Sequence, residues 1–118
     1  MRRGIKTKLD KLWSLAVKAK AGGKCELCFS VGALNSHHIF SRRFMGTRFD
    51  VSNGVCLCIG HHFEAHQKSS VFTLKILKKR GDAWHDALQL KSQKITKNLD
   101  DKLIEIELKE IIKLEGGR

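Results

Sequence analysis

Two short motifs in the middle of the chain carry cysteine and histidine at the same spacing. Cys25-x-x-Cys28 offers two thiolates from one turn, and Cys58-x-x-His61 offers a thiolate and an imidazole with a glycine in the gap. Thiolate and imidazole are the usual ligands of structural zinc, which takes four of them in a tetrahedron. The matching gaps predict a zinc site made of Cys25, Cys28, Cys58 and His61.

The ligand set of this site has alternatives. His62 adjoins His61 and, if it bound the zinc instead, would shift the helix that follows by one residue. Cys56 and Cys58 are a second candidate pair, although C-x-C spacing lacks the turn that chelating knuckles usually have. If Cys56 is not a ligand, it is a small buried thiol. A chain without any metal remains the third interpretation.

Four further histidines lie close together in the sequence: His37, His38, His62 and His66. On a helix, His62 and His66 share a face because residues four apart lie one above the other. On a strand, His37 and His38 point to opposite faces. One member of that pair can therefore join His62 and His66 around a metal while its neighbour does something else.

The elements that must position these side chains follow from the apolar periodicity. A basic amphipathic helix over 5–21 should end at Gly22 and Gly23. Two short strands and a short helix should follow, over 33–40, 54–58 and 60–68. Three more helices are predicted over 71–79, 83–93 and 99–114, the last two with Asp82 and Asn98 as N-caps. The last helix should bury a stripe made of Leu99, Leu103, Ile106, Ile111 and Leu114.

Three segments resemble the HNH endonuclease family: C-E-L-C, S-H-H-I-F-S-R-R and F-D-V-S-N-G-V-C-L-C-I-G-H-H. The resemblance spans Cys25 to His66. It implies an α+β fold with a ββα-metal core, in which two strands, a long loop and a helix surround one divalent cation beside a zinc knuckle. The expected organisation is a single nuclease domain with a basic helical arm (1–24), a zinc-braced core (25–68) and a helical extension (69–118).

The resemblance also implies roles for four histidines outside the zinc site. His38 is the general base, while His37 and His62 are ligands of the catalytic cation. Asn53 matches a central asparagine that shapes the loop and helps to orient the base or the metal ligands. His66 matches an extra ligand found in some members, and a solvated helix histidine is its alternative. The implied cation is Mg²⁺, Mn²⁺, Ni²⁺ or Zn²⁺, and imidazole ligands favour the later transition metals over Mg²⁺.

The charge of the chain points to a polyanionic partner. The net charge is +11, and the first 24 residues hold eight basic residues against one acid. Such an excess favours nucleic acid or an anionic membrane surface, although solvated helix faces can also be basic. Three arginines near the histidine motifs are predicted to contact DNA phosphates: Arg42, Arg43 and Arg48.

These observations predict a metal-dependent endonuclease that hydrolyses DNA. The G-G-K-C lead-in and the R-F-D-x-x-N stretch resemble phage-encoded HNH proteins, including recombination nucleases of the NinG type, and suggest recombination, packaging or restriction. One alternative is a non-catalytic zinc module that binds DNA. Another is an accessory subunit whose C-terminal helices dock on phage or host DNA-processing proteins. Without a signal peptide or a span of membrane length, a cytoplasmic protein with no membrane partner is expected.

Overall fold

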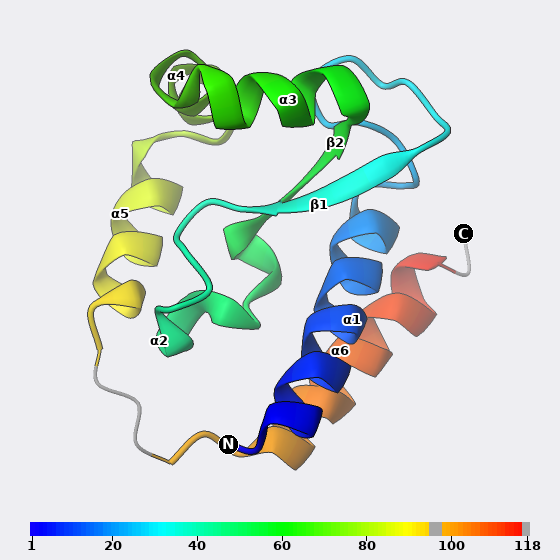
Figure 1. Cartoon of the computed structure of the whole chain (residues 1–118), viewed down its shortest axis with the longest axis vertical. Coiled ribbons are helices and arrows are strands. Elements are labelled where there is room, and N and C mark those ends of the chain that lie inside the picture. Colours follow the sequence, from blue (N-terminus) through cyan, green and yellow to red (C-terminus); the bar gives the residue numbers. More distant parts are fainter. Residues whose placement is uncertain (95–97, 117–118) are drawn as a thin grey trace.

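A two-stranded antiparallel sheet lies at the centre of the protein, between two groups of helices (Figure 1). The computed structural model describes residues 1–94 and 98–116. Strand β1 (Leu34–His38) pairs with β2 (Gly54–Cys58). The fold is α+β and mostly helical, as the sequence predicted.

The remaining elements are α1 (Arg3–Lys20), α2 (Met45–Arg48), η1 (Val51–Asn53), α3 (Ile59–Gln67), α4 (Ser69–Arg80), α5 (Asp82–Ser92) and α6 (Asp101–Gly116). The predicted strands and helices all form, in the predicted order. The short helices α2 and η1 were not predicted, and they lie in the loop that joins the strands. Among the described residues, no helix is long and apolar enough to cross a lipid bilayer.

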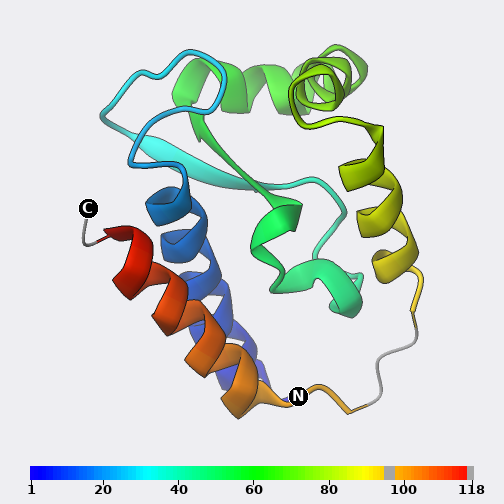
Figure 2. The ribbon, with the colours of Figure 1, turned by 180° about the vertical axis from the view of Figure 1, so that it is seen from behind.

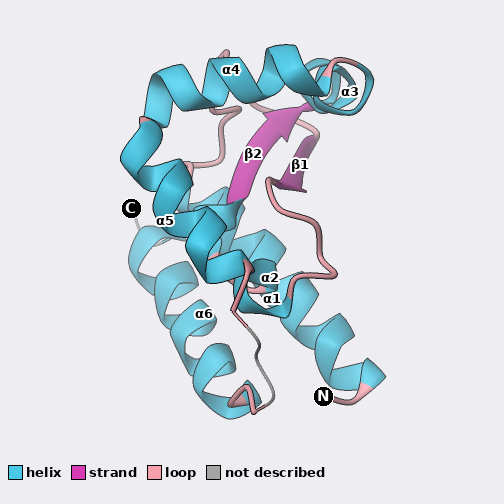
Figure 3. Ribbon diagram, turned by 90° about the vertical axis from the view of Figure 1, so that its left-hand side faces the viewer, coloured by secondary structure: helices cyan, strands magenta, loops and turns pink. Residues whose placement is uncertain are grey.

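The helices cover the sheet from two sides. Helices α3 and α4 lie together on one side, and α1 lies on the other (Figures 1 and 3). Helix α6 packs along α1 in the same direction, and the pair is seen from behind in Figure 2. An ion pair of 2.9 Å between Lys8 and Glu105 links the first halves of these two helices. The chain thus encloses the sheet with helices that are distant in sequence.

Strand β2 is buried on both faces and divides the apolar core in two. Cys56 packs against Trp13 and Val17 of α1. Val55 and Leu57 point the other way, into the core formed with α3 and α4. Successive side chains of a strand alternate between faces. Each residue of β1 therefore faces either α1 or α3, according to its register with β2.

The register of the two strands separates the neighbouring histidines of β1. His37 lies opposite Val55, and His38 lies opposite Gly54. Residues directly opposite each other in an antiparallel pair share a face of the sheet. His37 is therefore on the α3 side and His38 on the α1 side, as the alternation of a strand predicts.

Both predicted helix caps are wrong. Helix α5 has Gly81 at its N-cap position, and Asp82 already lies in the first turn without capping it. There its charge is favourable to the helix dipole. Near the start of α6, the Asp100 carboxylate, rather than Asn98, accepts the Leu103 N–H at 3.1 Å.

The predicted apolar stripe of α6 is also largely wrong. Leu103, Ile106 and Leu114 are exposed, and Leu99 precedes the helix. The packed side is instead made of Ile104, Leu108, Ile111 and Ile112. Because α6 carries apolar residues on more than one side, the sequence allows two stripes, and contact with α1 selects the one around Leu108.

Gly54 marks the closest approach of α1 to the sheet. A Cβ at this position would lie 2.3 Å from Val17 Cγ2 and 2.8 Å from Trp13 Cζ2, and both neighbours are buried. We expect Gly54→Ala to lower the free energy of unfolding by about 1–3 kcal/mol, measured by urea denaturation. Gly60→Ala is the matched control, because its Cβ meets nothing within 4 Å. Equal effects of the two substitutions would contradict a close approach at Gly54.

Candidate metal centres

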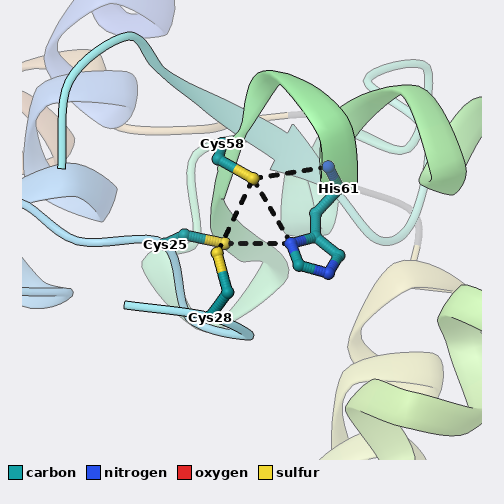
Figure 4. Close-up of side chains that lie close together, drawn as sticks. All are labelled: Cys25, Cys28, Cys58 and His61. Carbon is teal, nitrogen blue, oxygen red and sulfur yellow. Dashed lines mark hydrogen bonds between the residues drawn. The ribbon is translucent and has the colours of Figure 1, made fainter. Parts of the chain in front are cut away.

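Cys25, Cys28, Cys58 and His61 meet where the loop after α1 touches the start of α3 (Figure 4). The sulfurs of Cys28 and Cys58 are 3.8 Å apart, and His61 Nδ1 is 3.6 Å from Cys25 Sγ and 3.3 Å from Cys58 Sγ. Tetrahedral zinc ligands, at bond lengths of about 2.0–2.3 Å, lie roughly 3.3–3.8 Å from one another. The cluster could therefore hold a metal such as zinc.

Hydrogen bonds around the cluster favour the thiolate form that binds metals. The His61 backbone N–H donates to Cys58 Sγ at 3.4 Å and lowers the pKa of that thiol. The Ser30 hydroxyl lies 3.1 Å from Cys28 Sγ, and this bond lowers the pKa of Cys28 to about 6. Burial raises the pKa of Cys25, so a bound cation is what would stabilise its charge.

The loop that carries Cys25 and Cys28 is held against β2 from two directions. The Glu26 N–H donates to the Cys56 carbonyl at 2.8 Å. Arg80 of α4 donates to both carboxylate oxygens of Glu26, at 2.8 and 2.6 Å, and to the Gly54 carbonyl at 2.8 Å. The first two cysteines are thereby fixed relative to Cys58, which is at the end of the same strand.

The structure distinguishes the alternatives for the fourth ligand of this cluster. His61 joins the cysteines, whereas His62 belongs to a second group. The two side chains diverge because consecutive residues of a helix are about 100° apart around its axis. Cys56 lies outside the cluster and is 1% exposed in the core beside α1, where burial raises its pKa.

His37, His62 and His66 form the second group, with one ring nitrogen of each within 4.8 Å of the others. The Nε2 atoms of His62 and His66, four residues apart on α3, are 3.1 Å apart. The His37 ring reaches them from β1, and the buried Phe72 ring lies 5.2 Å away from it. Burial, together with the charges of His66 and His62, lowers the pKa of His37 to about 4. The neutral form that ligates metals is therefore present at pH 7.

His38 makes different contacts, on the other side of the strand. Its Nε2 lies 3.0 Å from the Arg48 carbonyl, which can only accept, so Nε2 carries the proton. Its ring stacks on Trp13 with 3.7 Å between centroids and 6° between planes. Burial lowers the pKa of His38, so the ring is neutral. Within the described chain Nδ1 has no hydrogen-bond partner, which leaves its lone pair free to accept a proton.

Asn53 shapes the loop that presents the Arg48 carbonyl. Its side chain is fully buried, accepts the Phe40 N–H at 2.7 Å and donates to the carbonyls of Phe40 and Thr47, both at 3.0 Å. One amide thus joins the chain just after β1 to helix α2. The resemblance implies a loop-shaping role for Asn53, and these hydrogen bonds are the contacts through which it would act.

Four of the five histidines outside the cysteine cluster line one open groove of about 500 Å³: His37, His38, His62 and His66. The other lining residues come mainly from α1 and the start of the loop: Asp10, Trp13, Ser14, Ser36 and Arg42. Ser36 joins the strand to α1 by donating to the Ser14 carbonyl at 2.9 Å. Three imidazoles that could hold a metal ion and the imidazole of His38 therefore line the same open space.

Of the three arginines predicted to contact phosphate, the structure brings only Arg42 to this groove. Arg48 donates to both oxygens of Asp10, at 3.0 and 2.7 Å, and its side chain is only 16% exposed. The Arg43 guanidinium lies over the Phe44 ring. Arg42 also lies 3.9 Å from Asp10, but its side chain is 63% exposed, so it is the best placed of the three to meet a phosphate.

The sequence analysis did not predict the contribution of α1 to the groove. Asp10 is the only acid among the first 24 residues, which otherwise hold eight basic side chains. That isolated carboxylate was the one feature of the sequence that could have indicated a role for α1 at the groove. Trp13 is buried in the core, but its contact with His38 could not be inferred from periodicity.

Compared with protein families, curated proteins and solved structures, the chain gives no match.

Proposed function

We propose that the protein is a metal-dependent HNH endonuclease that hydrolyses phosphodiester bonds in DNA. In this proposal β1, the loop, β2 and α3 form its ββα-metal core. The supporting observation is that one groove contains three imidazoles suited to a single divalent cation and a fourth imidazole held as a neutral proton acceptor.

The two metal groups would have different tasks. The zinc bound by Cys25, Cys28, Cys58 and His61 is structural, because all four tetrahedral positions are filled by protein. A cation bound by His37, His62 and His66 would stabilise negative charge on the scissile phosphate and on the departing oxygen. Mg²⁺ prefers oxygen ligands, so these three imidazoles favour Mn²⁺, Ni²⁺ or Zn²⁺.

His38 accepts the proton of the attacking water at Nδ1. The ring then becomes an imidazolium, and its Nε2–H continues to donate to the Arg48 carbonyl, which stabilises the new charge. The water oxygen forms a bond to phosphorus as the bond to the leaving oxygen breaks, and the leaving oxygen takes up a proton from solvent, giving a phosphate monoester and a free hydroxyl. A general base in this role accelerates hydrolysis by about 10²–10⁴-fold.

The substrate class is supported by charge. The chain has a net charge of +11, and Arg42 is exposed at the groove. Arg48 neutralises Asp10, so the carboxylate does not repel a phosphate backbone. The resemblance of the sequence to phage-encoded proteins of the NinG type suggests a role in recombination, packaging or restriction within a bacterial host.

A plasmid-nicking assay tests this function. The purified protein, analysed for bound metal, is incubated with supercoiled plasmid and Mg²⁺, Mn²⁺, Ni²⁺ or Zn²⁺, with a chelator control. We expect one tightly bound zinc per chain and cation-dependent nicked circles, formed faster with Mn²⁺ or Ni²⁺ than with Mg²⁺. A protein that binds one zinc and DNA but nicks with none of the cations would instead be a non-catalytic zinc module.

A further inference from the structure

Trp13 covers one face of the His38 imidazole. The two rings are nearly parallel, 6° apart in plane and 3.7 Å between centroids. The indole itself is fixed, because it is 2% exposed and its Nε1–H donates to the Asp50 carbonyl at 2.7 Å. A fixed ring in parallel contact confines the imidazole to one plane.

The edge of the same imidazole is held by a second contact that also depends on α1. His38 Nε2 donates to the Arg48 carbonyl, and the Arg48 guanidinium is bound by Asp10. Asp10 and Trp13 are three residues apart in α1, so they lie on neighbouring positions of one helix face. One helix thus fixes both the plane of the His38 ring and the carbonyl that receives its proton.

A glycine in strand β2 makes room for the contact between Trp13 and His38. Gly54 lies directly opposite His38, and a Cβ there would come within 2.8 Å of Trp13 Cζ2. The absence of a side chain leaves the space that the indole occupies.

Trp84 provides a comparison within the same protein, because it also donates Nε1–H to a backbone carbonyl, that of Ser52 at 2.9 Å. Its ring packs under Arg80 and is not among the groove residues.

We infer that α1 is part of the catalytic machinery, with Trp13 and Asp10 as positioning residues that hold His38 with Nε2–H on the Arg48 carbonyl and Nδ1 free. This inference rests on the proposed nuclease function. Without the indole, the imidazole rotates about its χ2 bond and exchanges between tautomers. Fewer molecules then present a free Nδ1 lone pair to the groove.

Substitution of each tryptophan in the full-length, zinc-loaded protein tests the inference by activity. Trp13→Leu should lower kcat for plasmid nicking by about 10–100-fold with little change in KM, because misplaced catalytic groups act on the chemical step. Trp13→Phe keeps an aromatic face but loses the Nε1–H bond to the Asp50 carbonyl, so its loss of kcat should be smaller than that of Trp13→Leu. Trp84→Leu is the matched control and should leave kcat unchanged at temperatures where both variants remain folded by circular dichroism.

A second measurement does not depend on nuclease activity. Nitrogen-15 NMR of the histidine rings at pH 8 should show His38 as the single Nε2–H tautomer. In Trp13→Leu its two ring nitrogens should shift toward averaged values. Asp10→Asn, which leaves the core intact, should produce the same change to a smaller extent and lower kcat by about 3–10-fold. If Trp13→Leu does not fold, Asp10→Asn carries the test, and an unchanged His38 tautomer in that variant overturns the inference.

Three results would overturn the inference. One is an unchanged His38 tautomer in both Trp13→Leu and Asp10→Asn. Another is an equal loss of kcat in Trp84→Leu, and the third is a loss in Trp13→Phe as large as in Trp13→Leu. If the original protein nicks no DNA but the tautomer responds as expected, the positioning of His38 stands and the proposed nuclease function fails.

Discussion

His38→Ala should abolish DNA nicking and leave the bound zinc, the second cation and DNA affinity unchanged. Its ring is the proton acceptor of the proposed reaction and belongs to neither metal group. Loss of a general base typically lowers the rate by about 10²–10⁴-fold. The initial rate of nicked-circle formation measures this effect, and calorimetric titration with Ni²⁺ reports on the cation site.

Two other histidines make this result specific. His37→Ala should lose both nicking and the second cation, because His37 Nδ1 or Nε2 lies with the ring nitrogens of His62 and His66. His85→Ala should retain full activity, since that ring is on α5 beside Trp84 and is not part of the groove. Normal cutting by His38→Ala, or a loss of Ni²⁺ affinity equal to that of His37→Ala, would refute the assignment of the base.

The contrast between His37 and His38 was predictable because it is a local property. Strand alternation alone sends neighbours to opposite faces, and the register with Val55 and Gly54 places those faces on α3 and α1. The separation of His61 from His62 has a similar origin in the phase of a helix. The spacing of Cys58-x-x-His61 favoured His61, and the structure places that residue with the cysteines.

The contribution of α1 to the groove was not predictable, because it depends on tertiary packing. Nothing in the spacing of Asp10 and Arg48 indicates that they pair across 38 residues of sequence. Because the Arg48 guanidinium is bound by Asp10, it is not free for the phosphate contact that the sequence predicted. Trp13 fits an ordinary apolar stripe, and the glycine that lets it approach His38 is 41 residues away, at Gly54.

Cys58→Ser should remove the zinc and destabilise the whole core. The serine hydroxyl preserves an acceptor for the His61 N–H at the start of α3, so the local helix cap is kept. It does not replace a thiolate as a zinc ligand. Structural zinc contributes about 10–16 kcal/mol in small zinc-binding units, similar to the net stability of a whole domain at about 5–15 kcal/mol. Several kcal/mol of unfolding free energy should therefore be lost, measured by urea denaturation together with zinc content.

Cys56→Ala is the matched control, two residues away on the same strand. Cys56 is buried in the α1-side core and is not part of the zinc cluster, so its loss leaves a small cavity worth about 1–2 kcal/mol and one zinc per chain. Removing zinc from the original protein with a chelator should reproduce the effect of Cys58→Ser and add nothing to it. Equal destabilisation by the two cysteine variants, or full zinc content in Cys58→Ser, would contradict the ligand set. Because Cys58 ends β2 and His61 lies in the first turn of α3, a zinc ion held by the cluster would connect the cysteine loop to the helix that carries His62 and His66. Its removal should therefore also weaken Ni²⁺ binding at the groove, although no zinc ligand belongs to that second site.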